Sequence, residues 1–536
     1  MNKRILFLVI LLVSLRLSAA EIPKADWHVI PLPQSVLMKS EKPFILSPKT
    51  TLRIDRRCQG NADMTRNLAF LHSYVLETTG LDLRTTSKEK KNQITLGLSN
   101  GIQNPEGYEI DASKNKINIH GVTPAGVFIA LQTLQKALPL VEGAKNIELR
   151  AVKIIDAPRF AFRGFMIDCC RHFFPVSYIK EIIDMLALHN INNFHWHLSD
   201  DQGWRIQIDR YPNLVTVGSK RKGTMKDWES KVCDSIPVEG YYTKEEAKAI
   251  VQYAADRHIN VIPEIDMPGH TTAALASYPW LGCTGGPYEV EWQPGVFEDV
   301  ICVGNPKTLQ FAKDVLAEIM EIFPSPYIHI GGDECPKTRW VQCPKCQEKI
   351  SELGLTNLDG YSKENRLQAW FMGELGKFIH EHGRKMVGWD EMLQGKPDSS
   401  STIMAWTSYE ASIRSAQGGH PTIVCPISNY YFSNPNYNKL TGTKSISRVY
   451  NLEPVSPKLN GNDARNIIGT QGCIWTEWTK DSLKMEWQIL PRIAALAESQ
   501  WTLPQNKDLN GFMHRLPKLV KYYEKKGWNY KKDILK

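Results

Sequence analysis

From about residue 156 onward, short apolar runs alternate along the chain with longer segments whose apolar residues recur at helical spacing. The short runs have the length of buried strands, and each is followed by an amphipathic helix. Eight such units predict a (β/α)8 TIM barrel, an α/β fold. The expected strands are residues 163–168, 191–198, 259–266, 327–334, 385–389, 402–406, 422–425 and 467–475.

The residues before the barrel have a different pattern, with short strands, turns and few helices. Strands are expected at 52–55 and 94–98, a hairpin at 107–110 and 117–120, and helices at 64–77 and 124–138. This mixture predicts a smaller α+β domain. We therefore divide the chain into an N-terminal domain at 21–155, a barrel at 156–510 and a helical C-terminal tail at 511–536.

The first 20 residues have the pattern of a secretory signal peptide. Lys3 and Arg4 precede the apolar run 5–13, and the small residues 18–20 provide a cleavage site. Arg16 interrupts the apolar stretch, and no later run is long enough to span a bilayer. We expect an exported protein, periplasmic or extracellular, without an integral membrane segment after signal removal.

Composition narrows the function classes. The net charge of +8 is mild for 536 residues, and no basic run is dense enough to indicate a nucleic-acid partner. The chain contains 15 tryptophans, which is an unusually high number. Indole is well suited to stacking on the apolar face of a sugar ring.

The 11 cysteines form an odd number, so at least one is unpaired in an oxidised protein. Cys283 and Cys302 flank a loop rich in glycine and proline and are candidates for a disulfide. Cys343 and Cys346 form a C-x-x-C motif, which can be half of a zinc site. No second ligand pair at suitable spacing is evident in the sequence, so we expect a local disulfide or buried thiols and no metal.

The ends of the predicted strands carry most of the candidate chemistry. Loops at the C-terminal ends of the strands build the active site of a TIM barrel. Nearly every strand there delivers an acid, an imidazole or an indole, and this convergence predicts a functional site. The residues are His195, His197, Asp200, Asp201, Glu264, Asp266, His270, Asp333, Glu334, Trp389, Asp390, Glu391, Trp406, Tyr431, Trp475 and Glu477.

Aromatic walls combined with carboxylates favour a carbohydrate substrate, and a barrel with paired acids is first a glycosidase candidate. The common double-displacement mechanism needs two carboxyl groups about 5–5.5 Å apart across the bond. The adjacent residues Asp333 and Glu334 do not obviously straddle a sugar in this way. Either a second acid lies on another strand, or the substrate supplies the nucleophile.

Four motifs in order along the barrel resemble glycoside hydrolase family 20 β-N-acetylhexosaminidases. They are residues 195–201 (HWHLSDD), 267–270 (MPGH), 329–334 (HIGGDE) and 388–391 (GWDE). The segment from Arg163-Gly164 to Arg171-His172-Phe173 also matches the family's first strand and the loop after it. The resemblance covers residues 158–501 and extends more weakly over the preceding domain.

The resemblance implies substrate-assisted catalysis, an exception to the two-carboxylate scheme. The 2-acetamido oxygen would attack the anomeric carbon and form an oxazolinium-like intermediate. Glu334 would be the general acid and then the base, while Asp333 would orient the acetamido N–H. One acid must then be protonated and the other ionised, and close neighbours favour such a split. No cofactor is implied.

The resemblance also implies substrate-binding roles at other strand ends. Tyr431 would hold the acetamido oxygen, and Arg163 with Glu477 would bind ring hydroxyls. His270, with Asp200 or Asp201, would support Glu334. The tryptophans expected to enclose the acetamido group and the ring are Trp389, Trp406 and Trp475. The partner is then a glycan with a terminal β-linked N-acetylglucosamine or N-acetylgalactosamine.

One position departs from the family pattern. Where the family usually has an aspartate two residues after the tyrosine, this chain has Ser433. A serine neither repels an anion nor requires a free hydroxyl, which suggests tolerance of an N-acetylglucosamine sulfated at O6. The alternative is that Asn434 or Asn436 replaces the missing contact.

Three alternatives remain at this point. His195-x-His197 is a motif that metal-dependent amidohydrolases also contain. Those enzymes carry it on the first strand, whereas here it follows the second strand, and no further ligand set completes it in the sequence. A sugar-binding barrel without activity would lack an acid such as Glu334. A disaccharide-releasing enzyme of the same family is the nearest rival, and the natural glycan and oligomeric state stay open.

Overall fold

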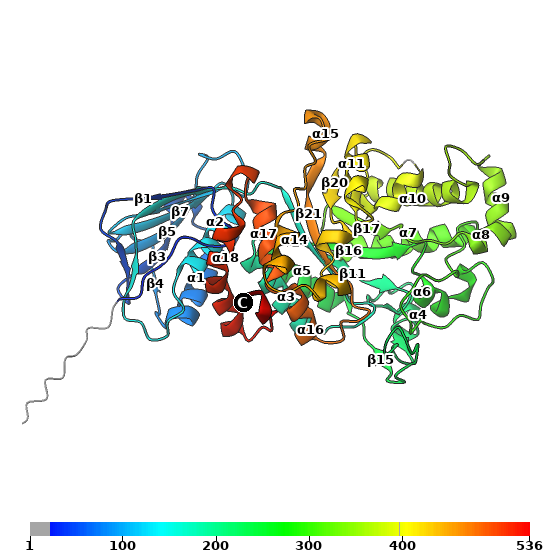
Figure 1. Ribbon diagram of the computed structural model, residues 1–536, viewed down its shortest axis with the longest axis horizontal. Helices are drawn as coiled ribbons and strands as arrows, with labels where there is room; N and C mark the ends of the chain where they lie inside the picture. The colour runs from blue at the N-terminus through cyan, green and yellow to red at the C-terminus, as the bar shows by residue number, and fades with distance from the viewer. Residues whose placement is uncertain (1–21, 396, 536) are drawn as a thin grey trace, which may run out of the picture.

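The computed structural model describes residues 22–395 and 397–535. An open sheet with helices on one side is followed along the chain by a closed barrel (Figure 1). The predicted signal peptide at residues 1–20 lies outside the described residues. The predicted fold class, a TIM barrel preceded by a smaller domain, is confirmed.

The N-terminal domain is built on a seven-stranded mixed sheet. Its order is β1 (Ser35–Met38), β9 (Val152–Asp156), β6 (Tyr108–Ala112), β7 (Lys116–Gly121), β5 (Gln93–Leu98), β3 (Thr51–Ile54) and β4 (Arg84–Thr85). Along β6 and β7, every second residue is fully buried, which is the pattern of a sheet covered on one face. The predicted hairpin is confirmed as the antiparallel pair β6–β7.

Two helices cover this sheet, α1 (Ala62–Thr79) and α2 (Pro124–Ala137). Asn61 caps α1 by accepting a hydrogen bond from the amide of Met64, and Thr123 caps α2 in the same way. Pro124 occupies the first turn of α2, where its missing N–H costs nothing.

The barrel closes through eight parallel strands in chain order. They are β10 (Phe162–Asp168), β11 (Asn193–His197), β16 (Asn260–Met267), β17 (Tyr327–Gly331), β18 (Lys385–Trp389), β19 (Thr402–Ala405), β20 (Thr422–Val424) and β21 (Ile467–Ile474). All residues of β10, β11, β19 and β20 are buried, because helices cover the outside and side chains fill the inside.

The outer layer consists of helices that follow the strands. The main ones are α3 (Val176–Leu188), α5 (Lys244–Ala255), α7 (Pro306–Ile322), α10 (Lys363–Glu381), α11 (Tyr409–Gln417), α16 (Ser482–Ile489) and α17 (Arg492–Trp501). The sequence pattern predicts one helix at residues 485–498 after the eighth strand, and this prediction is wrong, since the chain forms α16 and α17 with Leu490 and Pro491 between them. Proline has no N–H and restricts the residue before it, which ends a helix.

The last long helix, α18 (Leu509–Lys526), lies between the sheet domain and the barrel (Figure 1). The hydroxyl of Tyr522 donates to the carbonyl of Leu138 in the first domain, at 3.2 Å. The hydroxyl of Tyr523 lies 2.7 Å from Nε2 of His189 at the end of α3. Among the described residues, no helix is both long and apolar enough to cross a membrane.

Candidate active site

The turn after β17 places Asp333 and Glu334 at the C-terminal end of the barrel. Gly331 has a φ of +68°, and a Cβ there would lie 1.6 Å from Oδ1 of Asp266. Only glycine permits this approach between neighbouring strands. Glu334 itself has a φ of +43°, a conformation that costs a residue with a side chain about 1–3 kcal/mol.

Asp333 is buried, with 6% of its surface exposed, and only one of its two oxygens is close to a possible partner. Oδ2 lies 3.7 Å from Nε2 of His270, whereas Oδ1 has no hydrogen-bond partner among the described residues. Burial raises the pKa of Asp333 to about 6, and the nearby carboxylates of Glu264 and Glu334 add to this effect. An unpaired buried acceptor is costly unless a ligand satisfies it.

Glu334 is more open, since 42% of its side chain is exposed, and it interacts with His270 on the neighbouring loop. Its Oε2 lies 3.4 Å from Nε2 of His270, and the hydrogen bond to His270 lowers the pKa of Glu334. On the other side of the ring, Nδ1 lies 3.0 Å from Asp201 and 3.3 Å from Asp200. Burial opposes the charged ring, but the carboxylates raise the pKa of His270 well above its usual value.

An aromatic wall stands beside these acids, built from successive strand ends. Trp406 and Tyr431 stack with ring centroids 5.8 Å apart and an angle of 13°. Trp475 lies 6.1 Å from Tyr431 and 5.9 Å from Trp389. The indole N–H of Trp406 donates to Glu391 at 2.8 Å, while the buried Nε1 of Trp475 has no partner among the described residues. The structure therefore brings the four predicted aromatic residues together.

The centre of the barrel below this wall is a closed polar cluster around Glu264. This carboxylate contacts Nδ1 of His197 at 2.5 Å, Nε2 of His195 at 3.1 Å and Nδ1 of His329 at 2.9 Å. It also accepts a 2.9 Å hydrogen bond from Trp389. All five side chains are fully buried, so the imidazoles of the H-x-H motif support the barrel and lie out of a substrate's reach. This placement disfavours the amidohydrolase alternative.

The prediction that Arg163 binds ring hydroxyls is corrected by its position. Arg163 is the second residue of β10, so it lies at the N-terminal end of the barrel, away from the strand ends that carry the acids. It is 1% exposed, and both terminal nitrogens donate to Glu106 of the first domain at 2.7 Å. Arg163 therefore joins the two domains.

Arg171, in the loop after β10, occupies the place expected for Arg163. Nη2 lies 2.9 Å from Asp200, Nη1 lies 3.9 Å from Glu477, and the guanidinium covers the ring of Trp475 at 5.0 Å. The rule that active sites lie at the C-terminal ends of strands could have identified it, because Arg171 follows the first strand and Arg163 begins it.

Ser433 contacts the backbone just after β21 through its hydroxyl oxygen. Its Oγ accepts a hydrogen bond from the backbone amide of Trp475 at 3.1 Å. The side-chain oxygen of Asn434 in turn accepts from the amide of Asn436. The serine thus helps to position Trp475, and it adds no charge to the pocket.

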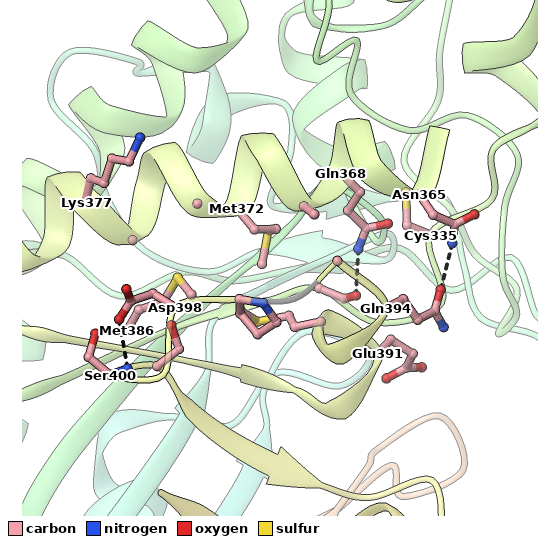
Figure 2. Close-up of a pocket in the computed structure, with 18 of the residues that line it drawn as sticks. Cys335, Asn365, Gln368, Met372, Lys377, Met386, Glu391, Gln394, Asp398 and Ser400 are labelled. Carbon is pink, nitrogen blue, oxygen red and sulfur yellow. Dashed lines mark hydrogen bonds between the residues drawn. The ribbon is translucent and has the colours of Figure 1, made fainter. Parts of the chain in front are cut away.

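A cavity of about 840 Å³ adjoins the acids, between α10 and the segment after β18. Figure 2 shows Gln368 on α10 pointing toward the turn after β17, where its amide donates to the carbonyl of Gly332 at 2.8 Å. Glu334 and Glu391 line the cavity, whereas Trp389, Trp406 and Trp475 do not. It is a neighbour of the tryptophan-walled site and not the site itself.

Carboxylates from several strand ends that face an indole wall define a barrel of the glycosidase type. Family models agree with this class. The model "Glycosyl hydrolase family 20, catalytic domain" matches residues 160–504, and "Glycosyl hydrolase family 20, domain 2" matches residues 26–157. The chain belongs to glycosyl hydrolase family 20.

Relatives and solved structures are consistent with this membership. A beta-hexosaminidase of Porphyromonas gingivalis is 35% identical over 96% of this chain and 66% of its own length. One of Vibrio furnissii is 34% identical over 73% of this chain and 64% of its own length. The family 20 beta-N-acetylhexosaminidase of Streptomyces coelicolor A3(2) superposes with a TM-score of 0.79, at 29% identity, covering 94% of this chain and 97% of that one.

Proposed function

We propose that the protein is an exo-acting, retaining β-N-acetylhexosaminidase that removes terminal β-linked N-acetylglucosamine or N-acetylgalactosamine by substrate-assisted catalysis. The observation that carries the proposal is the buried, unpaired Oδ1 of Asp333 beside the wall of Trp406, Tyr431 and Trp475. An acetamido N–H would satisfy this oxygen, and the indole rings would enclose the methyl group and the sugar face.

In the proposed reaction, the acetamido oxygen of the sugar forms a bond to the anomeric carbon as the glycosidic bond breaks. Glu334 gives its proton to the leaving oxygen, while Asp333 accepts a hydrogen bond from the acetamido N–H. Glu334 then takes a proton from water, which attacks the anomeric carbon and reopens the oxazolinium ring. Two inversions at this carbon give overall retention.

In the free site the order of the two pKa values is the reverse of the one this mechanism uses, because the pKa of Asp333 is raised by burial and that of Glu334 is lowered by its hydrogen bond to His270. We infer that the substrate reverses this order. Covering Glu334, which is 42% exposed, removes water and favours its neutral form, whereas an N–H donor to Asp333 favours the carboxylate. The charged His270 lies within 4 Å of both acids and is the nearest group that can donate a proton to either of them.

We assign the outer hydroxyls of the sugar to Arg171 and Glu477: Arg171 takes the place of the predicted Arg163, and Glu477 is kept from the pair predicted from the sequence. The uncharged Ser433 leaves open the acceptance of a sugar sulfated at O6, because no carboxylate stands at that position to repel the sulfate. We also propose that the protein is exported, on the pattern of its first 20 residues.

The experiment that tests the mechanism uses aryl glycosides whose acetamido group carries zero to three fluorine atoms. Fluorine withdraws electrons from the acetamido oxygen, so kcat/KM should fall with each fluorine if this oxygen is the nucleophile. Proton NMR during hydrolysis should show the β-anomer as the first product. Insensitivity to fluorine, or a first product of α configuration, would contradict the proposal.

A second assay separates the disaccharide-releasing rival. Chain-terminated N-acetylglucosamine oligomers should lose one sugar at a time from the non-reducing end. Release of disaccharide units would favour the rival enzyme.

A further inference from the structure

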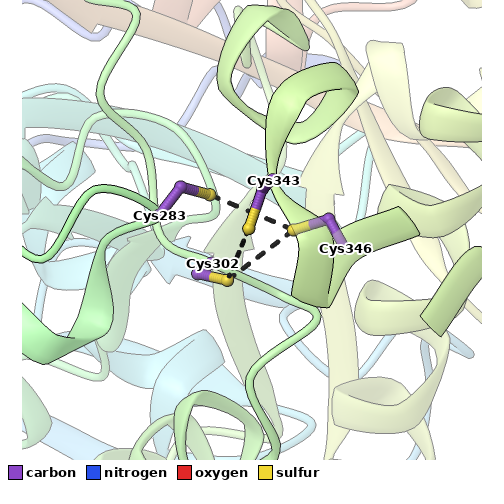
Figure 3. A group of neighbouring side chains, drawn as sticks. All are labelled: Cys283, Cys302, Cys343 and Cys346. Atoms are coloured by element: carbon purple, nitrogen blue, oxygen red, sulfur yellow. Dashed lines mark hydrogen bonds between the residues drawn. The ribbon is translucent and has the colours of Figure 1, made fainter. Parts of the chain in front are cut away.

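Four cysteines from two loops converge on one point outside the site described above. Cys283 and Cys302 belong to the connection between β16 and α7, and Cys343 and Cys346 flank the start of α9 (Pro344–Glu352). In Figure 3 their four sulfurs point toward a common centre. All four sulfur atoms lie within 4.8 Å of one another.

The sulfur spacing is that of a metal-binding tetrahedron. Cys302 lies 3.6 Å from Cys343 and 3.7 Å from Cys346, and Cys283 lies 4.0 Å from Cys346. A zinc–thiolate bond of about 2.3 Å gives a tetrahedral edge of about 3.8 Å between sulfurs. A disulfide needs about 2.05 Å, and all four cysteines are free thiols.

This arrangement corrects the expectations of a disulfide between Cys283 and Cys302 and of no second ligand pair. The antiparallel bridge between Gly282 and Ile301 brings the two residues side by side, although 18 residues separate them in the sequence. Because of this separation, Cys283 and Cys302 do not form a compact sequence motif. They are recognised as a ligand pair only from the way the loop folds.

The surrounding backbone holds the cluster closely. A Cβ on Gly304 would lie 2.3 Å from the carbonyl oxygen of Lys345, so the two ligand-bearing loops touch through their main chains. The indole of Trp340 donates to the carbonyl of Ile301 at 3.0 Å. Cys302, Cys343 and Cys346 are buried, and Cys283 is partly exposed, which leaves one side for the entry of an ion.

We propose that Cys283, Cys302, Cys343 and Cys346 bind one zinc ion as four thiolates. Four sulfur ligands leave no open coordination position, which is the signature of a structural site and not of a catalytic one. Four thiolates in tetrahedral geometry favour zinc, a divalent ion that has no redox chemistry. The ion would fasten the loop after β16 to the loop after β17, which carries Asp333 and Glu334.

The test begins with the full-length mature protein purified without chelator. Elemental analysis should give one zinc per chain, and intact mass under non-reducing conditions should correspond to free thiols at the four positions. If the isolated protein carries neither zinc nor disulfides, it is titrated with cobalt(II). One equivalent should then produce the d–d bands and thiolate charge-transfer band of a tetrahedral tetrathiolate.

Matched variants locate the site. Cys283→Ser removes the most exposed ligand and should weaken cobalt affinity by more than about tenfold, because even residues that only hydrogen-bond to metal ligands contribute about 10–100-fold. Cys233→Ser, which changes a partly exposed cysteine outside the cluster, should keep the stoichiometry and spectrum. A strong chelator should lower the Tm of the wild type and of the Cys233→Ser variant.

Two results would overturn the proposal. One is an isolated protein whose mass and peptide map show disulfides among these four cysteines. The other is a folded, reduced protein that binds no stoichiometric cobalt with a tetrahedral spectrum, or binds it equally well in the Cys283→Ser variant.

Discussion

Replacing His270 by glutamine is expected to move the acidic limb of the pH profile of kcat/KM to higher pH. This limb reports the free enzyme, and in the proposed mechanism it follows the ionisation of Asp333. The pKa of Asp333 is about 6 because burial and two neighbouring carboxylates raise it, while the charge of His270 lowers it. Glutamine preserves hydrogen-bonding capacity but removes the charge.

The size of the effect follows from the distance. Nε2 of His270 lies 3.7 Å from Oδ2 of Asp333. At an effective dielectric constant of about 20, unit charges at this separation interact by about 4 kcal/mol, which we take as an upper bound for the effect on Asp333. Opposite charges at such range usually change a carboxyl pKa by about 1–3 units, so the midpoint of the limb should rise by at least about one pH unit.

The assay is kcat/KM for an aryl N-acetylglucosaminide across the pH range in which the variant stays folded by circular dichroism. His72→Gln, on the first domain, is the control and should leave the profile unchanged. Asp333→Asn should abolish the limb and most of the activity. A midpoint that stays in place or moves to lower pH in the His270→Gln variant would refute the assignment of this limb to Asp333.

Three further predictions concern the acid and the corrected site. Glu334→Gln should lower kcat/KM about 10²–10⁴-fold on natural glycosides and much less on substrates with acidic leaving groups, and a uniform loss would argue against its role as acid. Arg171→Met should lower kcat/KM about 10–100-fold in the folded fraction and also lower the Tm, because it leaves the buried carboxylates of Asp168 and Asp200 unpaired, whereas Arg163→Met should cost about 3–5 kcal/mol in the free energy of unfolding and leave kcat/KM unchanged in the folded fraction. Ser433→Asp should abolish any activity on 6-sulfated aryl N-acetylglucosaminide while sparing the plain substrate, and equal rates on both would remove Ser433 as the determinant.

Much of the fold follows from local patterns that tertiary structure does not override. The barrel strands are continuous apolar runs because both of their faces are covered, and such runs are visible in the sequence. The wrong prediction of a single helix after the eighth strand arose because a backbone constraint overrides the local pattern there. The apolar period continues through α16 and α17, and the break at Pro491 is a backbone constraint that periodicity does not contain.

The site was predictable where a residue's position along its strand decides its role. Asp333, Glu334 and the tryptophans all lie at C-terminal strand ends, and the structure places them together. Arg163 failed this criterion, since it begins its strand. The cysteine cluster could not be predicted, because its two halves meet only through the folding of a long loop and a short helix.

The proposed zinc site lies where it would hold the loops of His270 and of the proposed acid Glu334 in place. His270 and Glu334 both have positive φ angles, of 52° and 43°, which the surrounding structure must enforce. The loop of His270 is fixed where the amide of Ile301, next to Cys302, donates to the carbonyl of Pro268 at 3.3 Å. The same connection meets the loop of Glu334 through the four sulfurs. A displacement of 1 Å at a reacting group can cost about 100-fold in rate, so an ion that fastens these two loops would maintain the 3.4 Å contact between His270 and Glu334 without taking part in the chemistry.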